Sequence, residues 1–214
     1  DLGSVPTLRV LMLGKNRIRA IRHLDKLTKL DVLDLHSNCI SKVEHLGCLT
    51  ELRVLNLAGN HIHVLEDVGA LQSLTELNAR RNQIENVYEL HFLPALQRVF
   101  LSNNRVQNFS AVSCLFKVKF LMELSLDGNP VALNDAAAYR RHLIDSIRTL
   151  RHLDLKRVTD QERRAAVMEH RREEERRRAV EKSEQVQVER KKVQAERNEA
   201  ILAAERQWME LQQA

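Results

Sequence analysis

The chain is poor in aromatic residues, proline and glycine. Of its 214 residues, 4% are aromatic, three are proline and six are glycine, whereas 43% are hydrophobic. The core must therefore consist mainly of Leu, Val and Ile side chains, because large rings are too few to fill it. Such an aliphatic composition favours the layered packing of small, similar units.

Cysteine is also scarce: the chain has three, with no Cys-x-x-Cys pair, and we expect no signal peptide. An odd number of cysteines in such a chain is typical of free thiols in a reducing compartment, and the cytoplasm fits best. Cys39 and Cys48, or His61 and His63, have no further metal ligands at suitable spacing. Glycine-rich phosphate loops and nucleophile elbows are missing as well. We therefore expect no metal, no cofactor and no enzymatic activity.

No apolar run approaches the roughly 20 residues that a membrane-spanning helix needs, so we expect no membrane partner. The net charge is +5, and the excess lies in residues 1–158, which hold 21 Lys and Arg against 16 Asp and Glu, whereas residues 159–214 hold 13 of each. A mildly basic surface suits an acidic protein partner. It falls short of a nucleic-acid-binding stripe, so we expect no nucleic-acid partner.

Asparagine recurs at a spacing of 22 residues, with a last spacing of 25. Around these asparagines the pattern L-x-x-L-x-L-x-x-N-x-I is repeated with small variations. A repeat of this length and pattern is typical of a leucine-rich-repeat solenoid. The repeated asparagines are Asn16, Asn38, Asn60, Asn82, Asn104 and Asn129.

The residue types of the repeat follow from the geometry of a coil. The leucines of L-x-L point inward from a short strand, and the x residues point outward. Each coil then turns away from its strand and leaves backbone donors and acceptors inside, where an Asn amide can satisfy them. We therefore give the six asparagines a structural role. The predicted fold is an α/β solenoid, a right-handed leucine-rich-repeat horseshoe whose coils bury their faces against their neighbours.

One stretch departs from the repeat. Aliphatic residues between strands step by three elsewhere, but Leu115 and Leu121 are six apart, which leaves three extra residues. Here Phe116, Val118 and Phe120 alternate with lysines, a pattern typical of a half-buried strand. The insertion is either additional core, which we favour, or a contact edge.

The C-terminal third should close the solenoid and then leave it. A helical stretch over about 135–149 and a last strand-like leucine pattern predict a cap, followed by the capping-box signature of Thr159 and Glu162 at the start of a helix. We therefore expect two domains, a capped solenoid over residues 1–158 and a long charged helix over residues 159–214.

The N-terminal end looks like half a repeat. Leu2, Val5 and Leu8 step by three without a preceding strand, and the chain starts without methionine. A solenoid needs a polar terminal cap, so we expect the protein to continue N-terminally.

Residues 159–214 lack glycine and proline and consist largely of strong helix formers. Ala179, Val186, Val193 and Ala200 recur every seven residues, but charged residues fill the second seam position that a two-stranded coiled coil needs apolar. We predict a solvated single helix, and whether it pairs with another helix stays open. Its C-terminal end is either a docking site for a partner, which we favour, or a frayed, partly apolar terminus. The partner-binding residues expected there are Ile201, Leu202, Trp208, Met209 and Leu211.

Binding in a solenoid usually uses the concave face, where outward strand residues form columns. Phe100 is an outward aromatic near Arg80 and Arg98, and we expect these three to bind a partner, because such anchors dominate interfaces. An apolar patch is expected nearer the N-terminus, although exposed β-branched residues also simply suit strands. The patch consists of Val10, Met12, Val32 and Val54.

The repeats resemble the short 22-residue class typified by a leucine-rich regulatory subunit of a serine/threonine phosphatase, and Asn129-Pro130 through Tyr139 resembles the cap of that class. Less generic stretches are similar to the leucine-rich-repeat subunit of the tubulin polyglutamylase complex. They are LMLGKNRI at 11–18, LDVLDLH at 30–36, LRVLNLA at 52–58, SLTELN at 73–78, VSCL at 112–115 and LDLKRVT at 153–159. This resemblance implies a non-catalytic subunit associated with microtubules, centrosomal satellites and cilia.

We therefore expect a scaffold or adaptor with protein partners. The expected partners are subunits of a tubulin-modifying or axonemal complex, with tubulin itself as a further candidate, and the expected location is the cytoplasm, at the cytoskeleton, cilium or centrosome. The alternative is a regulatory subunit that binds a phosphatase or another enzyme through the concave face. An enzyme in its own right is disfavoured by the missing catalytic residues.

Overall fold

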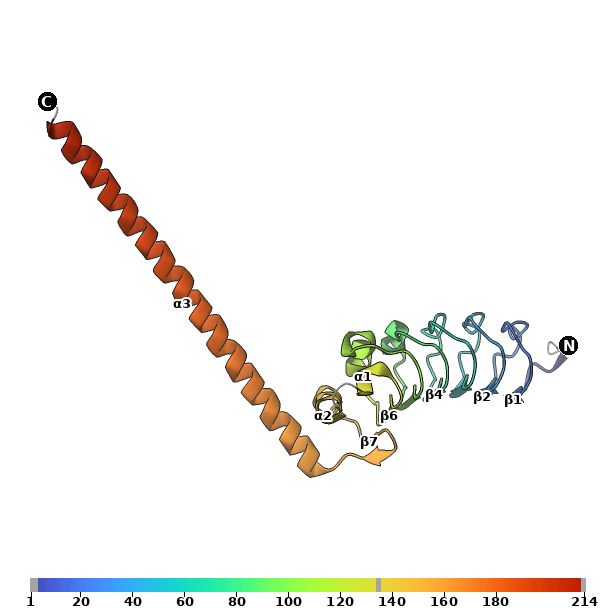
Figure 1. Ribbon diagram of the computed structural model, residues 1–214. Coiled ribbons are helices and arrows are strands. Elements are labelled where there is room, and N and C mark those ends of the chain that lie inside the picture. The colour runs from blue at the N-terminus through green and yellow to red at the C-terminus, as the bar shows by residue number, and fades with distance from the viewer. Residues whose placement is uncertain (1–3, 134–135, 213–214) are drawn as a thin grey trace. The chain divides into compact units, whose positions relative to one another are not determined.

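The computed structural model describes residues 4–133 and 136–212, and in the last helix it leaves out the side chains at 196, 200, 201 and 204–212. Chain packing separates two units, residues 1–166 and residues 167–214. The first unit is a solenoid whose coils stack side by side, each contributing one short strand (Figure 1). The predicted leucine-rich-repeat solenoid is confirmed.

An eight-stranded sheet runs along the solenoid in chain order. The central residue of each three-residue strand is buried and belongs to the core, because side chains alternate along a strand. Strands β1 to β7 are parallel, and β8 pairs antiparallel with β7 as a terminal hairpin. The strands are β1 (Val10–Met12), β2 (Val32–Asp34), β3 (Val54–Asn56), β4 (Glu76–Asn78), β5 (Arg98–Phe100), β6 (Glu123–Ser125), β7 (His152–Leu153) and β8 (Lys156–Arg157).

The opposite side of the coils changes along the chain. The first coils return through turns in which a backbone N–H bonds a carbonyl three residues earlier, as Leu27 does to Leu24 at 2.9 Å. Later coils contain the 3₁₀ helices η2 (Tyr88–Phe92) and η3 (Phe109–Lys117). Two α-helices, α1 (Pro130–Leu133) and α2 (Ala136–Ser146), form the cap, and α3 (Asp160–Gln212) follows.

The insertion near Phe116 adds to the core, as favoured, but it is not a strand, so the expected strand was wrong. Helix η3 takes up the extra residues, and the Asn108 side chain caps it by accepting a hydrogen bond from the Ala111 N–H at 3.2 Å. Val118 enters the core, whereas the Phe120 side chain is 58% exposed in the following turn. The alternation therefore reflects a helix end next to a surface turn.

The asparagine ladder is built as predicted. The Asn60 amide donates to the carbonyl oxygens of Leu35 and Leu57, both at 3.0 Å, and its oxygen accepts from the N–H of Ile40 at 3.0 Å. One side chain thus joins two successive coils. Asn16 at the N-terminal end is exposed and bonds only Leu13 and Gly14 of its own turn.

The residue before each ladder asparagine adopts a left-handed backbone conformation, which the leucine pattern did not predict. This conformation lets the chain turn sharply into the asparagine, although it is unfavourable for residues other than glycine. Only two of the six positions are glycine. The six left-handed residues are Lys15, Ser37, Gly59, Arg81, Asn103 and Gly128, with φ between 53° and 72°.

The predicted cap closes the solenoid through polar contacts. The Tyr139 hydroxyl, whose pKa is raised by burial and by Asp154, donates to that carboxylate at 2.9 Å. The other oxygen of Asp154 accepts from the backbone N–H of Leu126, directly after β6, at 2.8 Å. The cap therefore replaces, with side-chain oxygens, the partners that a further coil would supply.

Helix α3 begins with the predicted capping box. Thr159 and Glu162 exchange bonds, with the Thr159 N–H donating to Glu162 at 2.8 Å and the Glu162 N–H donating to the Thr159 hydroxyl at 3.2 Å. Arg140 of α2 pairs with Glu162 at 2.6 Å and holds the pKa of that carboxyl at about 2. Ala166 is also buried, so the first turns of α3 pack with the solenoid unit.

We predict that Asn60→Ala destabilises the solenoid by about 2–4 kcal/mol, because it leaves buried backbone groups of two coils without partners. Urea unfolding of residues 1–166, followed by circular dichroism, measures the loss. Asn16→Ala is the matched control and should cost about 1 kcal/mol or less, since its side chain is exposed. Equal losses of unfolding free energy in the two variants would contradict the conclusion that the buried asparagines stabilise the solenoid by joining successive coils.

The pairing of Glu162 with Arg140 also predicts a pH dependence. Because the folded pKa of Glu162 is lowered to about 2 from 4.5, its contribution to stability is present above pH 4.5 and is lost as the pH falls toward 2. Glu162→Gln removes this contribution at every pH. The difference in unfolding free energy between wild type and variant should therefore shrink from pH 7 to pH 2.5, and a constant difference would refute the assignment.

Candidate protein-interaction surface

The outward residues of the strands form the columns that the repeat spacing predicts. Val10 pairs in register with Val32, and Val32 with Val54, so the three valines lie side by side across β1 to β3. The second column joins Asn78 to Phe100. Positions 22 residues apart are therefore neighbours on one face of the sheet, along the row of strands in Figure 1.

The N-terminal end of this face carries the accessible apolar side chains. Met12 is 67% exposed and Val10 is 50% exposed, while Val32 and Val54 are half-buried. An exposed methionine beside a row of valines offers apolar surface that water covers poorly, and Met side chains adapt to varied partners. Binding by this patch stays a prediction.

Phe100 lies in its predicted column but is far less accessible than expected. Its side chain is 9% exposed, because the Arg80 guanidinium covers the ring at 4.2 Å from the centroid. Arg98, the other arginine expected to bind, pairs with Glu76 at 2.6 Å. Phe100 therefore holds Arg80 in place through a cation–π contact, and the side chains of Arg80 and Arg98 form the surface of this part of the face.

At the ends of β2 and β3, next to the row of valines, outward side chains stabilise their own turns, a role that sequence reasoning missed. Asp34 accepts from the backbone N–H of His36 at 2.9 Å, and Asn56 from that of Ala58 at 3.2 Å. The His36 ring also lies 2.7 Å from Asp34 and packs over Gly14, where a Cβ would come within 2.2 Å of the ring. An Asx residue at the last position of a strand, two positions before the backbone N–H that it accepts from, is the signal that could have shown this.

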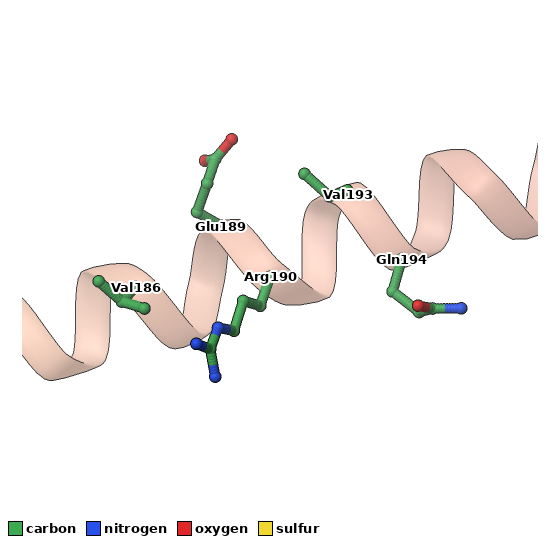
Figure 2. A pocket seen from close by; sticks show the side chains of 5 residues that line it. All are labelled: Val186, Glu189, Arg190, Val193 and Gln194. Atoms are coloured by element: carbon green, nitrogen blue, oxygen red, sulfur yellow. The ribbon is translucent and has the colours of Figure 1, made fainter.

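Helix α3 presents its valine seam to solvent. Val186 and Val193 are 45% and 55% exposed, and Figure 2 shows them with Glu189, Arg190 and Gln194 around a shallow hollow on this stretch of the helix. The charged side chains between the valines interrupt the apolar strip, as the heptad pattern predicts.

The expected docking end of α3 is only partly described. Leu202 is 53% exposed. Ile201, Trp208, Met209 and Leu211 belong to the helix, but their side chains lie outside the described residues.

Among the described residues, no cluster of three or more His, Cys, Asp or Glu side chains could hold a metal ion. The three cysteines are free thiols. Cys114 donates to the Val87 carbonyl, and burial raises its pKa to about 11, so it is a poor nucleophile at neutral pH. Among the residues that the structure describes, every helix is too short or too polar to cross a bilayer.

Comparison with known proteins agrees with this architecture. The family model described as leucine-rich repeat matches residues 31–183, and a model of two leucine-rich repeats matches residues 6–48. The human leucine-rich repeat-containing protein 49 is 44% identical over 55 residues, which are 26% of this chain and 8% of that protein. The chain thus spans a small part of this relative.

Solved structures show the same fold over most of the chain. A chain of the Drosophila melanogaster SNF/U2A′ complex is 25% identical, with 75% of this chain and 92% of that chain covered and a TM-score of 0.60. A leucine-rich-repeat protein of Leptospira interrogans is 24% identical, with 71% and 38% covered and a TM-score of 0.63. An internalin of Listeria monocytogenes is 23% identical, with 73% and 50% covered and a TM-score of 0.58.

Proteins with this fold generally mediate protein–protein interactions and are typically non-catalytic. The family match covers more than half of the residues, and the strands, asparagine ladder and cap lie where the repeat requires them. The chain therefore belongs to the leucine-rich-repeat family.

Proposed function

We propose that this chain is a non-catalytic scaffold or adaptor subunit of a microtubule- or cilium-associated complex. It acts in the cytoplasm, at the cytoskeleton, cilium or centrosome, and binds protein partners through the concave face and through helix α3. The partners are subunits of a tubulin-modifying or axonemal complex, and tubulin is a further candidate.

The observation that carries the proposal is the apolar patch on β1 to β3. Met12 and Val10 expose apolar surface on a rigid sheet, where Val32 and Val54 extend it in register. Burying such side chains is favourable by about 25 cal/mol per Å² of apolar surface, and a preformed sheet loses little conformational entropy on binding. A binding role explains why apolar side chains occupy outward positions there.

The assignment to microtubules rests on the similarity of variable repeat positions to the leucine-rich-repeat subunit of the tubulin polyglutamylase complex. The basic excess of residues 1–158 also suits acidic tubulin surfaces. A similarly folded chain was crystallised within the SNF/U2A′ complex, which agrees with a role as a subunit of an assembly.

A pull-down from ciliated-cell extract tests the partner class. Full-length chain and residues 1–166 serve as baits, because residues 1–166 form one packed unit that includes the cap contacts of Tyr139 and Arg140. Mass spectrometry should show tubulin-modifying or axonemal proteins with both baits, and partners held by α3 should be lost from the shorter one. Enrichment of a phosphatase without such proteins would replace the proposal with the regulatory alternative.

Charge introduced into the apolar patch should abolish capture by the concave face. In Val10→Asp/Met12→Asp, both changes fall on exposed side chains, so the fold should be retained while binding of the solenoid-dependent partners drops about tenfold or more. Leu133→Asp, at a cap residue that is 73% exposed, is the control and should bind like wild type. Unchanged capture by the double variant would exclude this surface.

A further inference from the structure

A ladder of backbone hydrogen bonds defines one edge of the solenoid, just before the strands begin. At each step, an N–H donates to the carbonyl oxygen of the equivalent residue one coil earlier, at 2.7–3.0 Å. We call this line the strand-start edge. Its residues are Arg9, Asp31, Arg53, Thr75, Gln97, Met122 and Arg151.

In the N-terminal half, charges near the strand-start edge neutralise one another. Arg53 pairs with Asp31 at 2.7 Å and lowers the pKa of that carboxyl. Glu51, in the preceding turn, pairs with Lys29 and lies 4.0 Å from Arg9. Cations and anions therefore alternate from coil to coil, and the surface there is electrically balanced.

At the cap end, four cations gather at the same edge. Lys119, Arg148, Arg151 and Arg163 line one pocket of about 460 Å³, and no carboxylate is among its lining residues. Within residues 4–133 and 136–212, none of these four side chains forms an ion pair. Four cations around one hollow repel one another, so an anion bound there would relieve that repulsion.

The pocket also has an apolar side. Phe120 is 58% exposed, and Met122 is half-buried beside it. The equivalent turn position holds Lys29, Glu51, Ser73, Ala95 or Thr149 in other coils, so an aromatic is peculiar to the coil that carries the insertion. Nothing in the 22-residue repeat requires Phe120, whose ring costs free energy in water unless it is covered.

The framework of the pocket is held by hydrogen bonds. Arg163 donates to the carbonyl oxygens of Arg148 and Leu150 at 2.8 and 2.7 Å, which places its guanidinium and braces the neighbouring turn. The Thr149 hydroxyl donates to Leu121 at 2.6 Å, and the Arg151 N–H donates to Met122 at 2.7 Å. A ligand would therefore meet a preformed site and order few groups on binding.

We propose that this cationic pocket binds an acidic peptide segment that carries an apolar side chain. The carboxylates pair with Lys119, Arg148 and Arg151, while the apolar side chain packs on Phe120. A peptide fits better than a nucleic acid, because the four cations surround one compact hollow and do not form an extended stripe along the solenoid. This site is separate from the concave patch, and its test does not depend on the microtubule assignment.

Fluorescence anisotropy with the full chain tests the proposal directly. The probe is a fluorescein-labelled peptide with one Phe between two pairs of Glu, and a second peptide has Ala in place of Phe. Arg148→Glu/Arg151→Glu should weaken binding by about tenfold or more, since two attractive contacts become repulsive. Arg17→Glu/Arg19→Glu, which makes the same net-charge change on exposed residues of the first coil, should weaken it about twofold or less.

Phe120→Ala separates the pocket from general charge attraction. It should weaken binding of the Phe peptide several-fold and leave the Ala peptide unaffected, because only the Phe peptide packs on the ring. Circular dichroism checks that each variant retains its fold. Equal weakening by both charge reversals, or no effect of Phe120→Ala, would overturn the proposal, as would tighter binding of a labelled polyuridine of equal charge.

Discussion

The hydrogen bonds between each buried ladder asparagine, from Asn38 onward, and the backbone of two coils are the interaction on which the rest of the molecule depends. The Asn60 amide donates to the carbonyl oxygens of Leu35 and Leu57, and its oxygen accepts from the Ile40 N–H, inside an aliphatic core where no water can replace it. An unpaired backbone group there would cost about 1–3 kcal/mol, so each coil whose asparagine is buried must keep it. This requirement sets the coil spacing. To place the asparagine, the residue before it must adopt a left-handed backbone conformation, which is unfavourable for residues other than glycine.

Once the spacing is set, residues one repeat apart become neighbours, and the outward side chains form columns. The asparagine ladder does not restrict which residue types occupy these columns. At the ends of β2 and β3, Asp34 and Asn56 stabilise the turns that follow their strands. The ends differ: Val10 and Met12 expose apolar surface at one end, and four cations line one pocket at the cap end. Two surfaces of different chemistry on one rigid body suit a subunit that joins two partners.

Prediction from sequence succeeded where a residue type has one structural use. The ladder asparagines, the strand columns and the Thr159–Glu162 capping box were all predicted, because each depends on fixed local spacing. Prediction failed at the insertion, where alternation indicated a strand and the chain forms helix η3. Alternation is a sound signal only if every residue in the run belongs to one element, and here Val118 and Phe120 belong to different environments.

The sequence by itself determined the coil length, the inward and outward positions and the start of α3, because these follow from periodicity and from contacts within a few residues. Only the tertiary structure decided which outward side chains are accessible. Phe100 was expected to be exposed and is covered by Arg80 from the preceding coil. Phe120 was expected in a half-buried strand, but its side chain is exposed in a pocket lined by cations. Accessibility and charge balance depend on side chains from neighbouring coils, so no local pattern in the sequence contains them.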